Sequence, residues 1–176
     1  MRNSIAYVCI CLIFFLQSCS PYTINEKSNY YVYDSRKSIT ELFDKNFSKT
    51  FVLFYSTVSC HDCLVNTGKL FNDSLFISND IDFICLCKYQ NSNAGIIVSK
   101  NMIFTNVPKI KKICFAIPGE KYFDIDIENI ASPSLLIFDN KKNTVLKYYK
   151  YLDMFTTSGK VKPQVFSELV NFIKKT

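Results

Sequence analysis

The chain of 176 residues has a formal charge of +6, with 48% hydrophobic and 20% charged residues, which predicts one folded domain and argues against disorder. Only four glycines are present, and neither a GxGxxG nor a GxxxxGK[ST] pattern occurs, so a nucleotide-binding loop of these types is excluded. The basic residues are scattered and do not alternate with aromatics, which argues against nucleic-acid binding.

The N-terminal segment has the pattern of an export signal. Arg2 precedes an apolar run from Ile5 to Leu16, about a dozen residues long, whereas a membrane-spanning helix needs about 20. The next residues, Leu16-Gln17-Ser18-Cys19, resemble a bacterial lipobox with an unfavoured glutamine, which implies cleavage before Cys19 and its lipidation. We therefore expect a signal peptide over residues 1–18 and a membrane anchor on Cys19. The alternatives are an uncleaved signal anchor and a buried helix with an incidental cysteine.

The next segments lead into the folded domain, which we expect over residues 36–176. Residues 19–35, polar and rich in tyrosine, are interpreted as the lipidated cysteine and a flexible tether. A helical pattern begins at Ser38, which forms a capping box with Glu41. The apolar run Phe51–Tyr55 then predicts a buried central strand.

The remainder of the chain alternates between helical and extended patterns. A helix is expected after Cys60, strands at residues 81–89, 113–117, 135–138 and 144–151, and a last helix beginning at Pro163. Residues 91–112 fit a helix only in part, because Pro108 interrupts the pattern. This order of elements predicts a three-layer α/β domain.

The motif Cys60-His61-Asp62-Cys63 lies where strand 51–55 gives way to the next helix. Cys60 would then sit at a helix N-terminus, where unpaired N–H groups and the helix dipole stabilise a thiolate. Cys60 is therefore the candidate nucleophile, and Cys63 is the thiol that resolves the mixed disulfide. His61, the only histidine, would stabilise the Cys60 thiolate as an imidazolium, whereas the charge of Asp62 opposes it.

Together with a second segment, this motif resembles the thioredoxin superfamily. Residues 131–139, Ala-Ser-Pro-Ser-Leu-Leu-Ile-Phe-Asp, are similar to the part of that family that carries a cis-proline and leads into a strand. The resemblance implies a thioredoxin-like fold, with a central mixed sheet flanked by helices on both faces. It also implies that Pro133 is the cis-proline facing the cysteine pair and that Ser132 contacts the substrate. The chain departs from the family at Ser59, where an aromatic residue is usual, and lacks the buried acid in strand 51–55.

The function implied by the resemblance is that of an envelope thiol–disulfide oxidoreductase acting on exported proteins. Such an enzyme needs a redox partner protein but no cofactor. With Cys19 as the anchor, the expected location is a membrane of the bacterial cell envelope. The alternative is a non-catalytic binding module with a structural disulfide between Cys60 and Cys63. A peroxidase of the peroxiredoxin type is a third alternative and is disfavoured.

The cysteine pattern also admits other roles. A metal site at Cys60, His61 and Cys63 is disfavoured, because a metal needs about four ligands and no second CxxC or other histidine exists. Cys85 and Cys87 fall on one face of a strand, which favours packing as small hydrophobic residues. A disulfide from Cys114 to either of them stays open as an alternative. The cluster Tyr148–Tyr151 fits a peptide-binding surface but more commonly forms a half-buried strand.

Overall fold

The structure, a computed structural model, describes residues 30–32, 39–56, 59–72, 81–88, 93–110, 112–116, 121–126, 129–130 and 133–174. The predicted signal peptide, Cys19 and Ser132 lie outside these ranges. Within the described ranges, the elements alternate between strands and helices and confirm an α/β protein.

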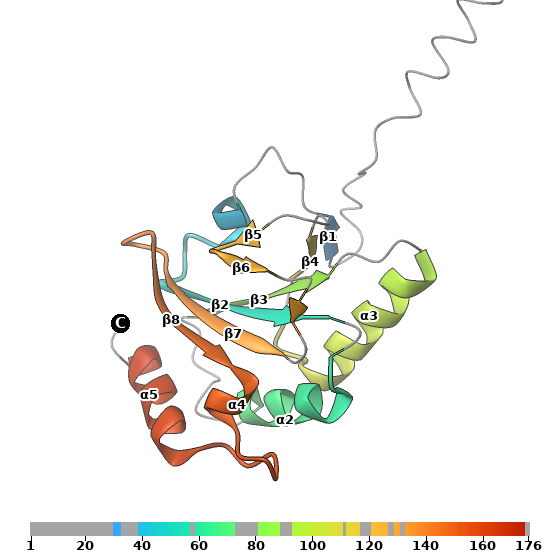
Figure 1. Cartoon of the computed structure of the whole chain (residues 1–176). Helices are drawn as coiled ribbons and strands as arrows, with labels where there is room; N and C mark the ends of the chain where they lie inside the picture. Colours follow the sequence, from blue (N-terminus) through green and yellow to red (C-terminus); the bar gives the residue numbers. More distant parts are fainter. Residues whose placement is uncertain are drawn as a thin grey trace, which may run out of the picture.

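A mixed sheet of six strands, in the order β1-β4-β3-β2-β7-β8, forms the centre of the molecule (Figure 1). Four of the strands are parallel, and the two strands of the β7–β8 side are antiparallel to their neighbours. The strands are β1 (Tyr30–Val32), β2 (Lys49–Tyr55), β3 (Ile81–Lys88), β4 (Lys112–Ala116), β7 (Ser134–Asp139) and β8 (Thr144–Lys150). As the apolar run predicted, β2 is buried along its whole length.

The α-helices cover one face of this sheet. Along β2, Phe51, Leu53 and Tyr55 point toward that face and share a core with the helices. The helices are α2 (His61–Phe71), α3 (Asn93–Asn106), α4 (Tyr151–Met154) and α5 (Pro163–Lys174). The chain crosses from β2 to β3 through α2 and from β3 to β4 through α3, moving in the same direction across the sheet. Because parallel crossovers are right-handed, both helices fall on the same face.

The opposite face is covered differently from what the resemblance implied. Its core contains Val52 and Phe54 of β2, and the described residues that cover it form the 3₁₀ helix η1 (Ile39–Leu42) and a small hairpin. That hairpin consists of β5 (Lys121–Tyr122) and β6 (Ile125–Asp126), and it lies with η1 above the sheet in Figure 1. Helices on both faces therefore stay a prediction: in the described residues, the α-helices lie on one face, and the 3₁₀ helix η1 and the hairpin lie on the other.

Several boundaries differ from the sequence-based expectation. Tyr30–Val32, assigned to the tether, forms β1, because pairing with β4 satisfies backbone groups that an edge strand leaves open. The helix expected from Ser38 is the single turn η1. Pro108 does not interrupt α3 but follows its end at Asn106. Pro163 does begin α5, as predicted.

A polar cluster holds the sheet together at the edge where β2 begins. The Asn140 side-chain amide donates to the Phe47 carbonyl oxygen at 2.9 Å and to Thr50 Oγ1 at 3.0 Å. On the neighbouring strand, Asp82 is buried, and its Oδ2 accepts a hydrogen bond from the Asp44 N–H at 3.0 Å. These bonds hold the segment before β2 against β7 and β3. They anchor the start of β2, which is the end of the strand distant from the cysteine pair.

Candidate functional site

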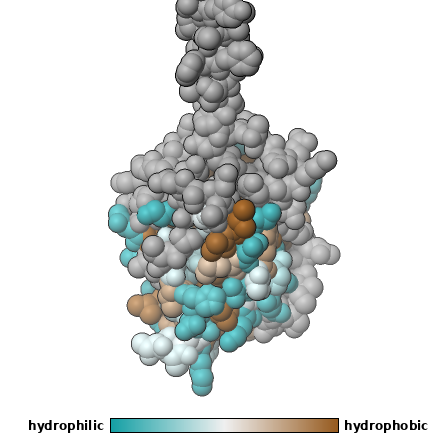
Figure 2. Space-filling model, turned by 90° about the vertical axis from the view of Figure 1, so that its right-hand side faces the viewer, coloured by the Kyte–Doolittle hydropathy of each residue, from teal (hydrophilic) through white to brown (hydrophobic). Residues whose placement is uncertain are grey.

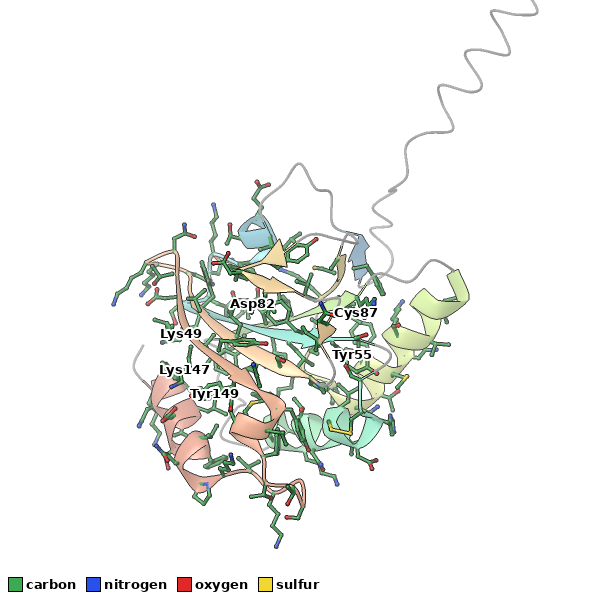
Figure 3. All side chains as sticks on the ribbon, viewed as in Figure 1. Lys49, Tyr55, Asp82, Cys87, Lys147 and Tyr149 are labelled. Atoms are coloured by element: carbon green, nitrogen blue, oxygen red, sulfur yellow. A yellow bond between two sulfur atoms is a disulfide. The ribbon has the colours of Figure 1, made fainter. Side chains whose placement is uncertain are left out.

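The cysteine pair lies at the junction between β2 and α2, as predicted. Cys60 is the N-cap of α2, and its Sγ accepts a hydrogen bond from the Cys63 N–H at 3.2 Å. Cys60 and Cys63 form a disulfide with their Cα atoms 5.2 Å apart, visible in Figure 3 at one end of α2. The Cys60 sulfur therefore lies against the N–H groups of the first helical turn, where a negative charge is stabilised.

The two cysteines differ in exposure. Cys60, His61 and Asp62 are exposed, whereas Cys63 is only 9% exposed and belongs to the core beneath α2. The Thr67 hydroxyl donates to the Cys63 carbonyl oxygen at 2.7 Å and holds this turn of the helix. A molecule that approaches from solution therefore meets Cys60 and not Cys63. The spacing alone did not show this asymmetry.

A hydrogen-bonded turn connects β2 to Cys60. The Ser59 N–H donates to the Ser56 carbonyl oxygen at 2.7 Å, and the Ser56 N–H donates to Ser59 Oγ at 3.2 Å. Ser56 is fully buried and Ser59 is 7% exposed. The side chain before the first cysteine therefore points into the protein. In the sequence, Ser59 stands out only as a departure from the thioredoxin pattern, and nothing near it indicates these hydrogen bonds.

Pro133 lies at the same edge of the sheet as the cysteine pair. In the antiparallel pairing of β2 with β7, Ser134 lies opposite Phe54, so the buried Pro133 stands beside the end of β2. Ser132 and the peptide bond that joins it to Pro133 lie outside the described residues. The cis-proline and the docking role of Ser132 therefore stay predictions.

The remaining described cysteines are buried free thiols. Cys85 and Cys87 of β3 face the helices. Cys114 of β4 pairs with Leu86 of β3 and faces the opposite side of the sheet. Packing as small hydrophobic residues is confirmed, and the alternative disulfide from Cys114 is wrong because the thiols lie on opposite faces. Burial raises the pKa of Cys87 and of Cys114 from 9.0 to about 12, and it raises that of Cys85 well above 9.0.

Tyr55, the last residue of β2, packs beside these thiols. It pairs with Cys87 in the sheet, and its hydroxyl lies 4.0 Å from the sulfur of Met102 on α3 (Figure 3). Burial, with smaller effects of Cys87 and Cys85, raises the pKa of Tyr55 to about 12. Its hydroxyl therefore stays protonated at neutral pH.

The tyrosine cluster at the end of β8 is mostly buried. Tyr149 is 3% exposed, and its hydroxyl donates to Glu168 Oε2 of α5 at 2.6 Å. Lys147 Nζ lies 5.4 Å from the centre of the Tyr149 ring and 3.8 Å from the same carboxylate oxygen (Figure 3). The Tyr151 hydroxyl accepts a hydrogen bond from Asn66 Nδ2 of α2 at 3.0 Å. The half-buried-strand interpretation is confirmed for Tyr149, which attaches α5 to the sheet.

Apolar side chains are exposed on α3. Ile97 and Val98 are 57% and 53% exposed. Figure 2, which faces the side of the molecule where α3 lies, shows brown side chains among hydrophilic ones. The sequence pattern of residues 91–112 had not indicated an exposed apolar face.

Within the described ranges, no group of three or more His, Cys, Asp and Glu side chains is arranged to hold a metal ion. In the same part of the chain, no helix is long and apolar enough to cross a membrane. No protein-family model, curated protein or solved structure matches the chain.

Proposed function

We propose that the chain is a thiol–disulfide oxidoreductase of thioredoxin-like fold, acting through Cys60 and Cys63. The observation that carries this proposal is a CxxC disulfide at the start of a helix, with an exposed first cysteine and a buried second one. Pro133 supports it, because it stands beside the end of β2 at the same edge of the sheet.

The reaction requires two exchange steps that move two electrons. In the reduced protein, the Cys60 thiolate attacks one sulfur of a substrate disulfide, and the substrate S–S bond breaks and releases one substrate thiolate. The Cys63 thiolate then attacks Cys60 Sγ, which breaks the mixed disulfide and releases the second substrate thiolate. The protein is left with the Cys60–Cys63 disulfide. A redox partner protein would supply two electrons to reopen it, and the reverse sequence would oxidise a substrate dithiol.

The environment of each sulfur suits its step. The Cys63 N–H that contacts Cys60 Sγ can stabilise the Cys60 thiolate that attacks the substrate in the first step. Burial protects Cys63 from reagents in solution until the mixed disulfide brings the substrate to Cys60. His61 is exposed beside Cys60, and it adds positive charge near the thiolate whenever its ring is protonated.

The proposal includes export and anchoring at a membrane of the bacterial cell envelope. Its support is the sequence pattern alone: the short apolar run ending at Leu16 and the lipobox-like Leu16–Cys19. Exported proteins with thiols or disulfides would then be the substrates. Oxidising conditions in that compartment agree with a closed Cys60–Cys63 pair.

Exchange of cysteine for serine in the full chain tests the roles of the two sulfurs. We expect Cys60→Ser to lower the rate of disulfide reduction in a peptide substrate by about three orders of magnitude, because the attacking sulfur is gone. Cys63→Ser should still attack but not resolve, so a mixed disulfide accumulates and is detected by intact mass. As a matched control, Cys114→Ala removes a buried thiol from the opposite face of the sheet and should leave the rate unchanged. Full activity of Cys60→Ser would refute the proposal.

The alternative, a non-catalytic binding module with a structural disulfide, predicts a different redox equilibrium. An exchangeable pair should have a reduction potential above about −300 mV, whereas structural disulfides in exported proteins lie below that value. The full chain is equilibrated with glutathione buffers, alkylated, and analysed by mass. We expect a potential above this limit. A pair that stays closed far below it supports the binding module and contradicts the oxidoreductase.

A further inference from the structure

The turn before Cys60 is closed by two hydrogen bonds between the same two residues. One is a backbone bond from the Ser59 N–H to the Ser56 carbonyl oxygen, and the other joins the Ser56 N–H to the Ser59 hydroxyl. Ser56 follows directly after Tyr55, the last residue of β2. Ser56 is fully buried, where a backbone donor requires a partner inside the protein, and Ser59 Oγ accepts from its N–H.

The turn leaves the backbone of Cys60 with little conformational freedom. Its neighbour Ser59 is held by the turn, and Cys60 itself has φ −55° and ψ 120° as the N-cap of α2. In that conformation its Sγ lies 3.2 Å from the Cys63 N–H. Charge stabilisation by a helix N-terminus falls off within the first turn, so a small displacement of Cys60 weakens it.

We propose that Ser59 is a positioning residue for Cys60: its buried hydroxyl closes the turn that places the Cys60 sulfur against the start of α2. The inference rests on the proposed function, because it concerns the thiolate that performs the exchange. It explains the departure from the family pattern, since a residue that turns inward to bind the Ser56 N–H must be small and carry an acceptor. Every aromatic side chain fails the first requirement, and phenylalanine and tryptophan carry no acceptor either.

Two substitutions separate the effect of losing the hydroxyl from the effect of changing the size of the side chain. Ser59→Ala removes the acceptor, and Ser59→Thr keeps it. In the full chain carrying Cys63→Ser, the rate at which Cys60 forms an adduct with an aromatic disulfide reagent is followed from about pH 5 to 9. We expect Ser59→Ala to slow the reaction at neutral pH about fivefold and to move the midpoint of the pH–rate profile upward. Ser59→Thr should retain the rate within about twofold and the original midpoint.

A matched control separates positioning from a general loss of stability. Asn140→Ala removes hydrogen bonds at the opposite end of β2, so it should lower stability while leaving the rate and the pH profile of Cys60 unchanged. An unchanged profile in Ser59→Ala would overturn the inference, as would equal slowing by Asn140→Ala. If Cys60 does not react even with Ser59 in place, the proposed function itself fails, which is seen without any Ser59 variant.

Discussion

Above pH 9, we expect the protein to lose stability steeply and to unfold at alkaline pH without added denaturant. Cys85, Cys87 and Cys114 are buried free thiols, and burial raises the pKa of each above its value of 9.0. In the unfolded chain, they release their protons near pH 9, whereas Cys87 and Cys114 hold theirs up to about pH 12 in the folded protein. Between these limits, the folded state binds more protons, so rising pH favours the unfolded state.

The expected size of this effect is large compared with the stability of a domain. Each thiol contributes about 1.4 kcal/mol per pH unit, so three contribute about 4 kcal/mol per pH unit. A total stability of about 5–15 kcal/mol would be exhausted within a few pH units. Above pH 10, Tyr55 adds to the loss, because burial raises its pKa to about 12. Below pH 8, these groups are protonated in both states and cause no pH dependence.

Urea unfolding of the full chain at a series of pH values measures this loss directly. We expect the free energy of unfolding to be constant from about pH 7 to 8 and then to fall. Replacing one of the buried thiols, as in Cys114→Ala, should reduce the slope above pH 9 by about a third, because one titrating group is removed. A stability that stays level between pH 8.5 and 10.5 would contradict the buried state of these thiols.

We expect Gly68→Ala to destabilise the protein strongly, although alanine is the better helix former. Gly68 lies in the second half of α2, where Asn106, the last residue of α3, approaches so closely that an added Cβ would overlap its carbonyl oxygen. A backbone oxygen cannot rotate away, so α2 has to shift from α3. Helix propensity alone would predict a gain of about 1 kcal/mol. Overpacking outweighs this gain, and we expect a net loss of about 2–3 kcal/mol.

Chemical denaturation of the full chain tests this expectation. The neighbouring exposed residue provides the control: Lys69→Ala should change the free energy of unfolding by no more than about 0.5 kcal/mol. Because α2 carries both reactive cysteines, the shift in Gly68→Ala should also slow disulfide exchange. A Gly68→Ala variant as stable as the parent, or more stable, would show that α2 and α3 do not meet as closely as described.

The sequence by itself determined the elements that hold the cysteine pair. An unbroken apolar run such as Phe51–Tyr55 requires burial on both faces, and β2 is buried throughout. Pro163 begins α5, because proline has no N–H to lose at the first position of a helix. A CxxC motif directly after a strand then places Cys60 at a helix N-terminus. These features depend on residues that are close together in the chain, so the sequence alone is enough to predict them.

Only the tertiary structure decided which face each element covers and which distant groups meet. Alternation along β3 and β4 shows that successive side chains point to opposite faces of the sheet. It does not set the register between the two strands. The pairing of Leu86 with Cys114 is what separates Cys114 from Cys85 and Cys87. In the same way, nothing near Gly68 in the sequence indicates that the carbonyl of Asn106 lies against it. Such contacts depend on how whole elements pack, and packing is set by the shapes of surfaces distant in the chain.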